Sequence, residues 1–344
     1  MHFISVFNAY LNERLKLNGL LDSSPMIFND SYTSCTLCHH NCGVNRLTGQ
    51  RGLCGETGEL RLAKAGLHFG EEPPLTGSGG SGTIFISGCS MNCPFCQNYQ
   101  ISRSPQNGGG MGRVVRSDEF TEICVALQNE GAENLNLVTP SHMAPTLVSY
   151  LRKVRKAGVM LPVAWNSSGF ESSGTVEMAA EVVDIWLPDL KTLDDAAARR
   201  IYGVEGYPEA AAAAILQMAD YGGVDVNKNG LMVRGLMVRH LILPGELDST
   251  RGVLAWFAEN LKGRAWLSLM SQYTPVHIPG EKKNIPERQL NKAEYERVLE
   301  WLDEFGIDDG FVQDLVPGED WLPDFGKPNP FSSDLSRIIW NGAI

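Results

Sequence analysis

The sequence predicts an α/β protein that is built on a parallel sheet and preceded by a small cysteine-rich segment. From residue 83 onward, short apolar runs alternate with longer stretches in which apolar residues recur at helical spacing. This alternation is typical of β–α–β units, whose strands run parallel. Seven of the eight cysteines fall into two tight groups, at residues 35–54 and 89–96. With 344 residues, 43% of them hydrophobic, the chain can form one large domain and a small appendage.

The first predicted unit covers residues 1–66 and contains the first cysteine group. Residues 3–21 have the apolar spacing of a short amphipathic helix. Cys35, Cys38, Cys42 and Cys54 follow. Four thiolates this close in sequence can surround one metal centre, either a structural Zn or a second Fe–S cluster. Two histidines at positions 39 and 40 lie between these cysteines, where each could replace a thiolate or be an ordinary loop residue.

The second predicted unit covers residues 67–315 and contains the sheet. We expect six strands, at residues 83–87, 134–139, 161–166, 183–189, 236–243 and 266–270. We expect helices between them at about 117–130, 144–157, 172–181, 193–202, 208–221 and 249–262, and a further helix at 291–305. Six strands are fewer than the eight of a complete TIM barrel, and the pattern alone also fits a doubly wound sheet. Residues 316–344 are predicted to wrap around the outside.

The second cysteine group directly follows the first of these strands. Cys89, Cys93 and Cys96 have C-x3-C-x2-C spacing. Thiolates are soft ligands that select Fe–S clusters, Zn or Cu(I). Three cysteines are one short of the usual four for a [4Fe–4S] cube, so one iron of such a cube would stay open to another ligand. The alternative is a zinc knuckle that takes its fourth ligand from elsewhere.

This loop, with Phe95 just before the last cysteine, resembles the signature of radical S-adenosylmethionine (SAM) enzymes. Five further stretches are similar to the branch related to pyruvate formate-lyase activating enzyme, and the likeness covers about residues 31–315. They are His68-Phe-Gly-Glu-Glu-Pro-Pro-Leu-Thr-Gly77, Asn136-Leu-Val-Thr-Pro-Ser-His142, Asp184-Ile-Trp-Leu-Pro-Asp-Leu-Lys191, Val238-Arg-His-Leu-Ile-Leu-Pro-Gly245 and Ser268-Leu-Met-Ser-Gln-Tyr-Thr-Pro275. The resemblance implies a partial (β/α)6 TIM-like barrel that is open on one side. Related enzymes carry their extra clusters after the radical motif, so the N-terminal cysteine group departs from their pattern.

The resemblance also implies a reaction. SAM would bind the iron that Cys89, Cys93 and Cys96 leave open, and an electron from the cluster would cleave it. The products would be methionine and a 5′-deoxyadenosyl radical, which abstracts hydrogen from the substrate. The substrate would be a glycyl radical protein or, alternatively, a small molecule, a peptide or tRNA, and the electron donor would be a flavodoxin or a ferredoxin. A non-catalytic Fe–S or Zn scaffold is the competing hypothesis from another class.

Several polar residues stand at the carboxyl ends of the predicted strands, where parallel β/α proteins bind ligands. By resemblance, Phe95 would lie against the adenine and His240 would bind the ribose. Thr139 begins the stretch that replaces the family's Gly-Gly-Glu run, so its hydroxyl is a candidate for the SAM amino group. The alternative for Phe95 is a plain packing residue, and the alternative for His240 is a hydrogen-bonded core histidine.

The next two strands end in further candidates. Asn166 and Ser168 would contact the methionine carboxylate or the ribose. Asp189, with Lys191 two residues later, would bind SAM or the substrate. An ordinary surface salt bridge is the alternative for this pair.

Charge and hydropathy disfavour other classes of partner. The net charge is −11 and the chain has no basic run, so nucleic acid is an unlikely partner. No apolar run reaches the roughly 20 residues that span a bilayer. The N-terminal stretch lacks the features of a secretory signal, and clustered cysteines are typical of metal ligands in a reducing compartment. We therefore expect a cytoplasmic protein.

Overall fold

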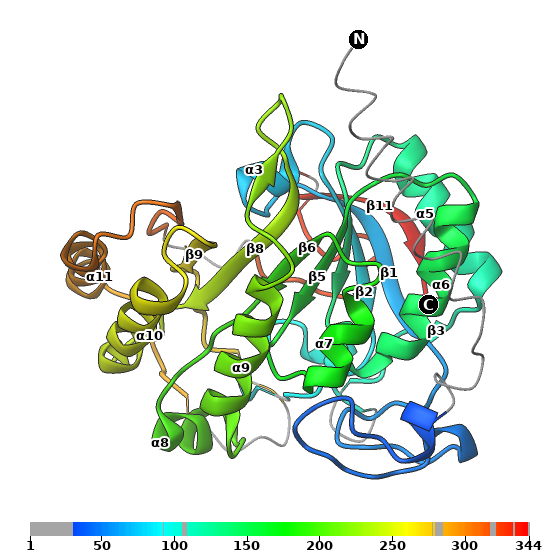
Figure 1. Ribbon diagram of the computed structural model, residues 1–344, viewed down its shortest axis with the longest axis horizontal. Coiled ribbons are helices and arrows are strands. Elements are labelled where there is room, and N and C mark those ends of the chain that lie inside the picture. Colours follow the sequence, from blue (N-terminus) through cyan, green and yellow to red (C-terminus); the bar gives the residue numbers. More distant parts are fainter. Residues whose placement is uncertain are drawn as a thin grey trace.

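The computed structural model describes residues 30–91, 93–104, 109–276, 278, 285–316, 321–332 and 334–342. The helix predicted at residues 3–21 lies outside these residues. Within them, the strands follow the order β10-β9-β8-β6-β5-β4-β2-β1-β11 (Figure 1). Neighbouring strands from β2 to β10 pair in parallel: β2 (Ser81–Ile86), β4 (Leu135–Val138), β5 (Val163–Ser167), β6 (Ile185–Pro188), β8 (Met232–Leu241), β9 (Trp266–Met270) and β10 (Gly310–Val312). The predicted fold class, an α/β partial barrel, is confirmed.

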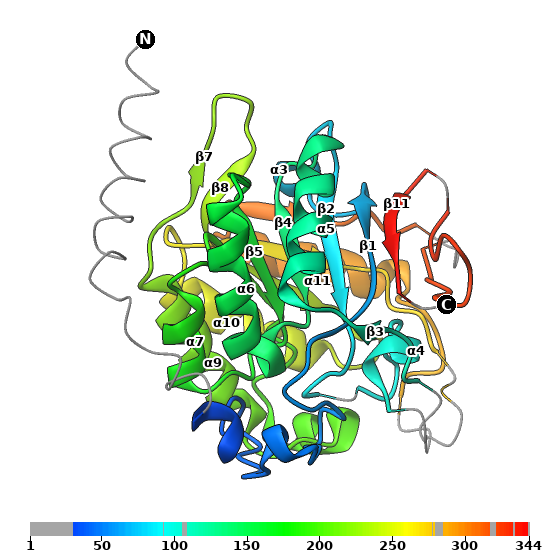
Figure 2. The ribbon, with the colours of Figure 1, turned by 90° about the vertical axis from the view of Figure 1, so that its right-hand side faces the viewer.

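Helices connect these strands and cover the outer face of the curved sheet (Figures 1 and 2). They are α5 (Ser117–Asn129), α6 (Ala144–Lys156), α7 (Ser173–Ala179), α9 (Tyr207–Ala219) and α10 (Leu247–Asn260), and α11 (Lys292–Phe305) packs on α10. The helix predicted at residues 193–202 is a short α8 (Asp195–Ala197) that continues as a π-helical turn, Ala198–Tyr202.

Four strands missing from the sequence prediction pair in antiparallel fashion. β1 (Arg61–His68) pairs with β2 on one side and with β11 (Ser336–Asn341) on the other. Two short strands, β3 (Arg113–Val114) and β7 (Asp225–Val226), extend β1 and β8. At the bulge in β1, a Cβ on Gly66 would lie 2.5 Å from the carbonyl oxygen of Arg337. The C-terminal strand can therefore reach β1 only because residue 66 has no side chain.

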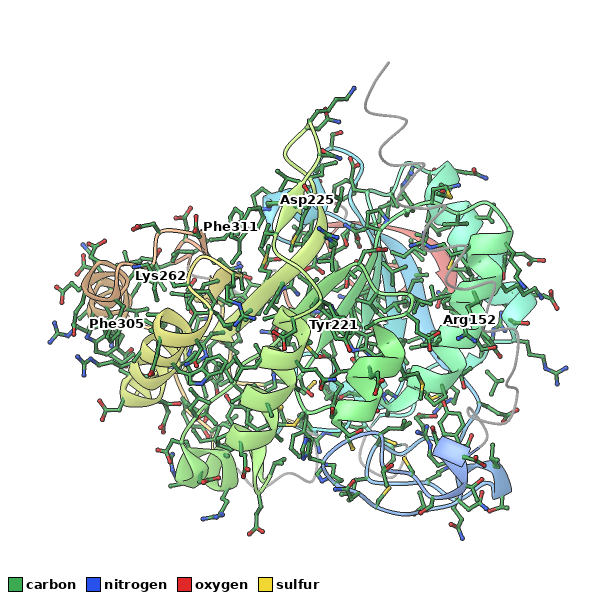
Figure 3. The ribbon with its side chains drawn as sticks, viewed as in Figure 1. Arg152, Tyr221, Asp225, Lys262, Phe305 and Phe311 are labelled. Atoms are coloured by element: carbon green, nitrogen blue, oxygen red, sulfur yellow. The ribbon has the colours of Figure 1, made fainter. Side chains whose placement is uncertain are left out.

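Side chains alternate between the helix-covered face of the sheet and the barrel interior. Trp165 and Val238 belong to the main core under the helices. Ala164 and Met237 pack inside the barrel with Leu75 of α3 (Pro73–Thr76), a short helix at the amino end of the sheet. Trp266 joins this inner group and contacts Phe311 of β10 edge-on, with ring centroids 5.5 Å apart (Figure 3). No helix in the described part of the chain is both long and apolar enough to cross a bilayer.

Candidate radical SAM site

The loop that follows β2 gathers three cysteine side chains at the carboxyl edge of the sheet. None of Cys89, Cys93 and Cys96 forms a disulfide, and each is half-buried. The Cys96 amide donates to the Cys93 carbonyl at 3.1 Å, and Arg103 donates to the same carbonyl at 2.8 Å. These bonds shape the loop before the short helix α4 (Tyr99–Ser102). The sequence-predicted cluster ligands therefore lie together in space.

The pKa of Cys93 reflects its burial and the charges of its neighbours. Burial raises the pKa of Cys93 to about 12, Lys191 lowers it, and Cys89 and Cys96 raise it. The thiol is therefore protonated unless a metal displaces the proton. Among the described residues, no three Cys, His, Asp or Glu side chains are arranged to hold a single metal ion. Three thiols from one loop are the donor set of a cube with one open iron, so these residues fit the predicted cluster.

Asp189 and Lys191 lie beside this loop. The Lys191 ammonium is 2.7 Å from the Asp189 carboxylate, and the two side chains are only 18% and 28% exposed. Both residues interact electrostatically with Cys93. The alternative of a surface salt bridge therefore does not describe this pair.

Thr139, at the end of β4, has an unusual backbone. Its φ is +60°, which is uncommon for a β-branched residue, and its amide donates to the Asn166 carbonyl at 2.9 Å. Strained backbone of this kind clusters at functional sites. The strain thus falls at the position where related enzymes carry the Gly-Gly-Glu run.

Two buried hydroxyls at the same edge have no protein partner in the described structure. They are the side-chain oxygens of Ser168, after β5, and Thr274, after β9. The backbone at Ser168 is held by Tyr207, whose hydroxyl donates to the Ser168 carbonyl at 2.9 Å. A bound ligand can satisfy such orphan groups, so these positions are compatible with SAM. Sequence reasoning selected Ser168 and Asn166 but missed Thr274, which ends the Ser268–Pro275 motif.

Phe95 is packed among aromatic residues. Its ring meets Tyr202 and Tyr273 edge-on, with centroids 5.7 and 5.3 Å away. These contacts account for its burial, and its contact with adenine stays a prediction.

His240 is held by the protein through both ring nitrogens. Its Nδ1 lies 2.7 Å from the Leu190 carbonyl, to which it donates, and its Nε2 lies 3.0 Å from the Thr250 hydroxyl. Burial lowers its pKa to about 4, so the ring is neutral near pH 7. The ring points toward α10, so its role in binding ribose finds no support in this geometry and stays a prediction.

Arg239 points into the barrel instead of His240, and sequence reasoning missed it. Its guanidinium donates to Glu72 at 2.9 Å and to Glu71 at 2.5 Å. Two sequence features could have identified it. Side chains of neighbouring residues in a strand face opposite ways, so Arg239 and His240 cannot both point into the barrel, and the His68–Gly77 motif supplies two glutamates that could pair with an arginine.

The N-terminal cysteine segment covers the same edge of the sheet (Figures 1 and 2). Cys38 forms a β-bridge with Glu171, and the His39 amide donates to the Phe170 carbonyl at 3.2 Å. His40 Nε2 is 2.7 Å from the carbonyl oxygen of Ser90. Ser90 belongs to the loop that carries Cys89, Cys93 and Cys96, which we call the radical loop. A Cβ on Gly88 would lie 2.8 Å from the Cys54 carbonyl oxygen. The two cysteine groups, distant in sequence, are therefore in contact.

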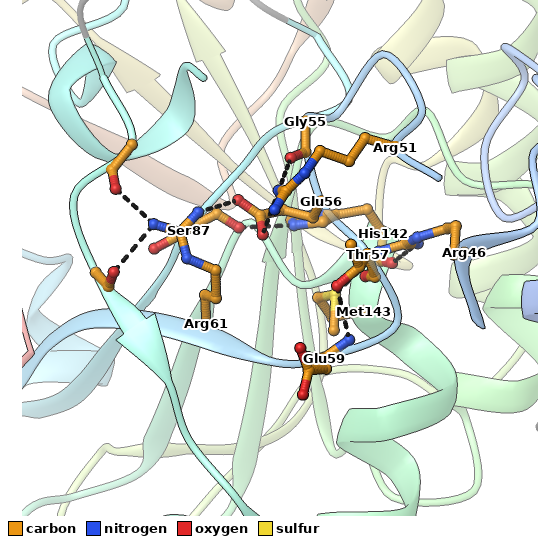
Figure 4. Close-up of polar contacts among 12 residues, drawn as sticks. Arg46, Arg51, Gly55, Glu56, Thr57, Glu59, Arg61, Ser87, His142 and Met143 are labelled. Carbon is orange, nitrogen blue, oxygen red and sulfur yellow. Dashed lines mark hydrogen bonds and ion pairs between the residues drawn. The ribbon is translucent and has the colours of Figure 1, made fainter. Parts of the chain in front are cut away.

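A buried arginine joins the cysteine segment to the loop after β4. Arg46 donates to the carbonyls of His142 and Thr57 (Figure 4). It also lies over the Tyr32 ring, 4.7 Å from its centroid. Its charge also interacts with Cys35 and Cys54. Figure 4 further shows Glu56 beside Arg61, which pair at 2.8 Å.

The four N-terminal cysteines are free thiols in this segment. Burial raises the pKa of Cys38 to about 12, with smaller contributions from Cys54, Cys35 and Cys42. The four groups thus interact with one another. Whether they hold Zn or a second Fe–S cluster stays a prediction.

The chain is similar to a protein of known sequence and to several solved structures. It is 28% identical over 304 residues to an uncharacterized protein of Methanocaldococcus jannaschii, which covers 84% of this chain and 80% of the relative. Among solved structures, Streptococcus suis SuiB bound to its precursor peptide SuiA matches 66% of this chain with 11% identity and a TM-score of 0.45. This match spans 46% of SuiB, less than half of its length.

A domain of pyruvate-formate lyase-activating enzyme from Bacteroides vulgatus is also similar. It covers 49% of this chain and 89% of that domain, with 12% identity and a TM-score of 0.35. The family model described as the radical SAM superfamily matches residues 83–255, which is half of the chain. The protein therefore belongs to the radical SAM superfamily.

Proposed function

We propose that this protein is an enzyme that carries a [4Fe–4S] cluster on Cys89, Cys93 and Cys96 and binds SAM at the carboxyl edge of the sheet. The observation that supports this most is the set of three cysteine side chains on one loop, next to the half-buried Lys191–Asp189 pair. When bound, the cluster and SAM supply a 5′-deoxyadenosyl radical that takes a hydrogen atom from the substrate.

The chain's own residues would hold and enclose these groups. The Lys191 ammonium offsets negative charge at Cys93, and Asp189 orients it. The orphan hydroxyls of Ser168 and Thr274 would hydrogen-bond to SAM. Phe95 and its aromatic neighbours exclude water next to the loop, which protects a reactive radical.

The proposed substrate is a protein that receives a glycyl radical. In the described structure, β10 and β11 end the sheet at opposite edges, so the barrel is not closed by strand pairing. A loop of a partner protein could enter on that side. Modification of a small molecule, peptide or tRNA is the alternative. The electron donor would be a flavodoxin or a ferredoxin.

Cys35, Cys38, Cys42 and Cys54 would hold a second metal centre, either Zn or an Fe–S cluster. The support is the electrostatic interaction of Cys38 with the other three cysteines. A variant with alanine at positions 89, 93 and 96 should keep this metal, measured as zinc, iron and sulfide per chain. Complete loss of metal from a folded variant would contradict this second centre.

The enzyme proposal is tested by forming 5′-deoxyadenosine. We would reconstitute the protein with iron and sulfide without oxygen and add dithionite and SAM. Product should form with wild type, disappear in Cys93→Ala and persist in Cys124→Ala, which removes a buried thiol of α5. If wild type holds a cluster and binds SAM but releases no product, the assay is repeated with candidate substrates. Failure to bind SAM would refute the proposal.

A further inference from the structure

A charged cluster lies inside the barrel and is formed by residues that are far apart in sequence. Glu71 and Glu72 precede α3, Asn136 belongs to β4, and Arg239 belongs to β8. Arg239 binds both carboxylates, and Asn136 Nδ2 donates to Glu71 at 2.9 Å. The four side chains therefore form one connected group.

This cluster lies deeper in the barrel than the proposed SAM site. Arg239 forms a β-bridge with Asp189, which pairs with Lys191 beside Cys93. The interior positions near the carboxyl ends of the strands are half-buried, whereas those one step deeper are fully buried. The half-buried positions are Val138, Asn166, Asp189, Leu241 and Met270. The interior side chains are thus more exposed at the carboxyl ends of the strands than beside the cluster.

The cluster has an excess of negative charge. Burial raises the pKa of Glu72, but the charge and hydrogen bonds of Arg239 outweigh this effect, and the net shift is downward. One guanidinium therefore faces two carboxyl groups. The Glu71 and Glu72 side chains are only 12% and 10% exposed. The two carboxyl groups share this one counter-ion, and Arg239, Asn136 and Ser268 donate hydrogen bonds to them.

Asn136 adds an unused acceptor to this group. The residue is 1% exposed, and its Nδ2 donates to Glu71 and, at 3.2 Å, to Ser81. Its Oδ1 is buried and has no partner among the described residues. An excess carboxylate favours a positively charged partner, and an orphan amide oxygen requires a hydrogen-bond donor. A protonated nitrogen can meet both needs.

We propose that this cluster binds a protonated nitrogen of the substrate, an ammonium or a guanidinium, through Glu71 and Asn136. The inference rests on the proposed function, because the same substrate would present its hydrogen atom to the radical at the edge of the sheet. Arg239 acts as a positioning residue that holds both carboxylates in place. If the cluster were only structural, Glu71 would serve the ion pair alone and its loss would simply weaken the fold.

The test is thermal unfolding with a simple cationic probe, without reductant or SAM. Pentylammonium chloride at about ten times its dissociation constant should raise the midpoint of wild type by about 2 °C. Sodium pentanoate and pentanol should not. Glu71→Gln should lose the response to pentylammonium and unfold at or above the wild-type temperature. Glu130→Gln, which removes a carboxylate from a surface pair with Arg337, should keep the response.

Two outcomes would overturn the proposal. One is a wild-type protein that does not respond to pentylammonium, or responds equally to pentanoate. The other is a folded Glu71→Gln protein that keeps the wild-type response. Because SAM chemistry is not involved, these outcomes are distinct from a failure of the enzyme proposal, which appears only in the 5′-deoxyadenosine assay.

Discussion

The substitution His240→Gln tests whether His240 has a structural role or binds the ribose of SAM. In the folded protein the pKa of His240 is about 4, because burial disfavours the charged ring, against an ordinary value of 6.5. The unfolded chain therefore takes up this proton at a higher pH than the folded chain. The stability that depends on the neutral ring is present above pH 6.5 and is lost as the pH falls toward 4.

The size of this effect follows from the two pKa values. Each unit of pKa difference that the solution pH crosses is about 1.4 kcal/mol. Between pH 7.5 and pH 5.0, His240 should remove about 2 kcal/mol from the free energy of unfolding of wild type. Glutamine does not titrate, so the free energy of unfolding of His240→Gln should fall by about 2 kcal/mol less than that of wild type between pH 7.5 and pH 5.0. At pH 7.5 the variant should be less stable by about 1–3 kcal/mol, because the bonds to Leu190 and Thr250 are disturbed.

Urea unfolding at both pH values measures this double difference, and SAM affinity is measured by equilibrium binding. We expect the affinity for SAM to change less than twofold. His39→Asn, at an exposed histidine, is the control for general effects of losing an imidazole. Equal pH dependence in wild type and His240→Gln, together with a tenfold loss of SAM affinity, would refute the structural assignment and restore the ribose contact.

Two further substitutions test the strained and close-packed parts of the site, and a third tests an ion pair at the start of α11. Thr139→Gly removes a cost of about 1–2 kcal/mol for the left-handed backbone of a threonine and adds about 0.5–1 kcal/mol for the chain entropy of a glycine. Urea unfolding should therefore show equal or higher stability, while the affinity for SAM falls. A clear loss of stability would contradict this reasoning. Gly88→Ala should lower the free energy of unfolding by at least about 2 kcal/mol and reduce the iron content, because its Cβ would lie 2.5 Å from Glu56 and 2.8 Å from Cys54. The control Gly131→Ala, also at positive φ but in open space, should lower the free energy of unfolding by only about 1 kcal/mol and keep the iron. Glu294→Gln should cost about 1–2 kcal/mol at pH 7, because the hydrogen bond from Arg288 lowers the pKa of Glu294 to about 2, and the difference from wild type should shrink as the pH falls from 4.5 toward 2. A difference that stayed constant with pH would contradict that reasoning.

Six of the seven parallel strands could be predicted, because each is a short apolar run between helical stretches, whereas β10 was missed. The strand expected at residues 266–270 coincides with β9. The antiparallel edge could not, because β11 pairs with a strand about 270 residues earlier and depends on the close approach at Gly66. No local pattern in residues 336–341 carries that information.

The same limit explains the site. The sequence indicated that β8 brings polar residues to the cavity, but both faces of a parallel strand are buried, so pattern cannot decide which residue points inward. His240 was selected by resemblance, whereas Arg239 is the residue that faces the barrel interior. Arg46 was missed for a related reason: an arginine that is 1% exposed reads as a surface residue until its neighbours are known.

The contact between the two cysteine groups limits what activity measurements can reveal about the first group. His40 holds the radical loop at Ser90, and the chain at Cys54 packs against Gly88. A Zn ion that orders this segment would therefore stabilise the conformation of the radical loop. An Fe–S cluster in the same place would stabilise it too and would also transfer electrons. Loss of activity in Cys38→Ala is expected from both arrangements. Metal and sulfide analysis of protein that lacks Cys89, Cys93 and Cys96 separates them, because it reports the first group alone and does not depend on turnover.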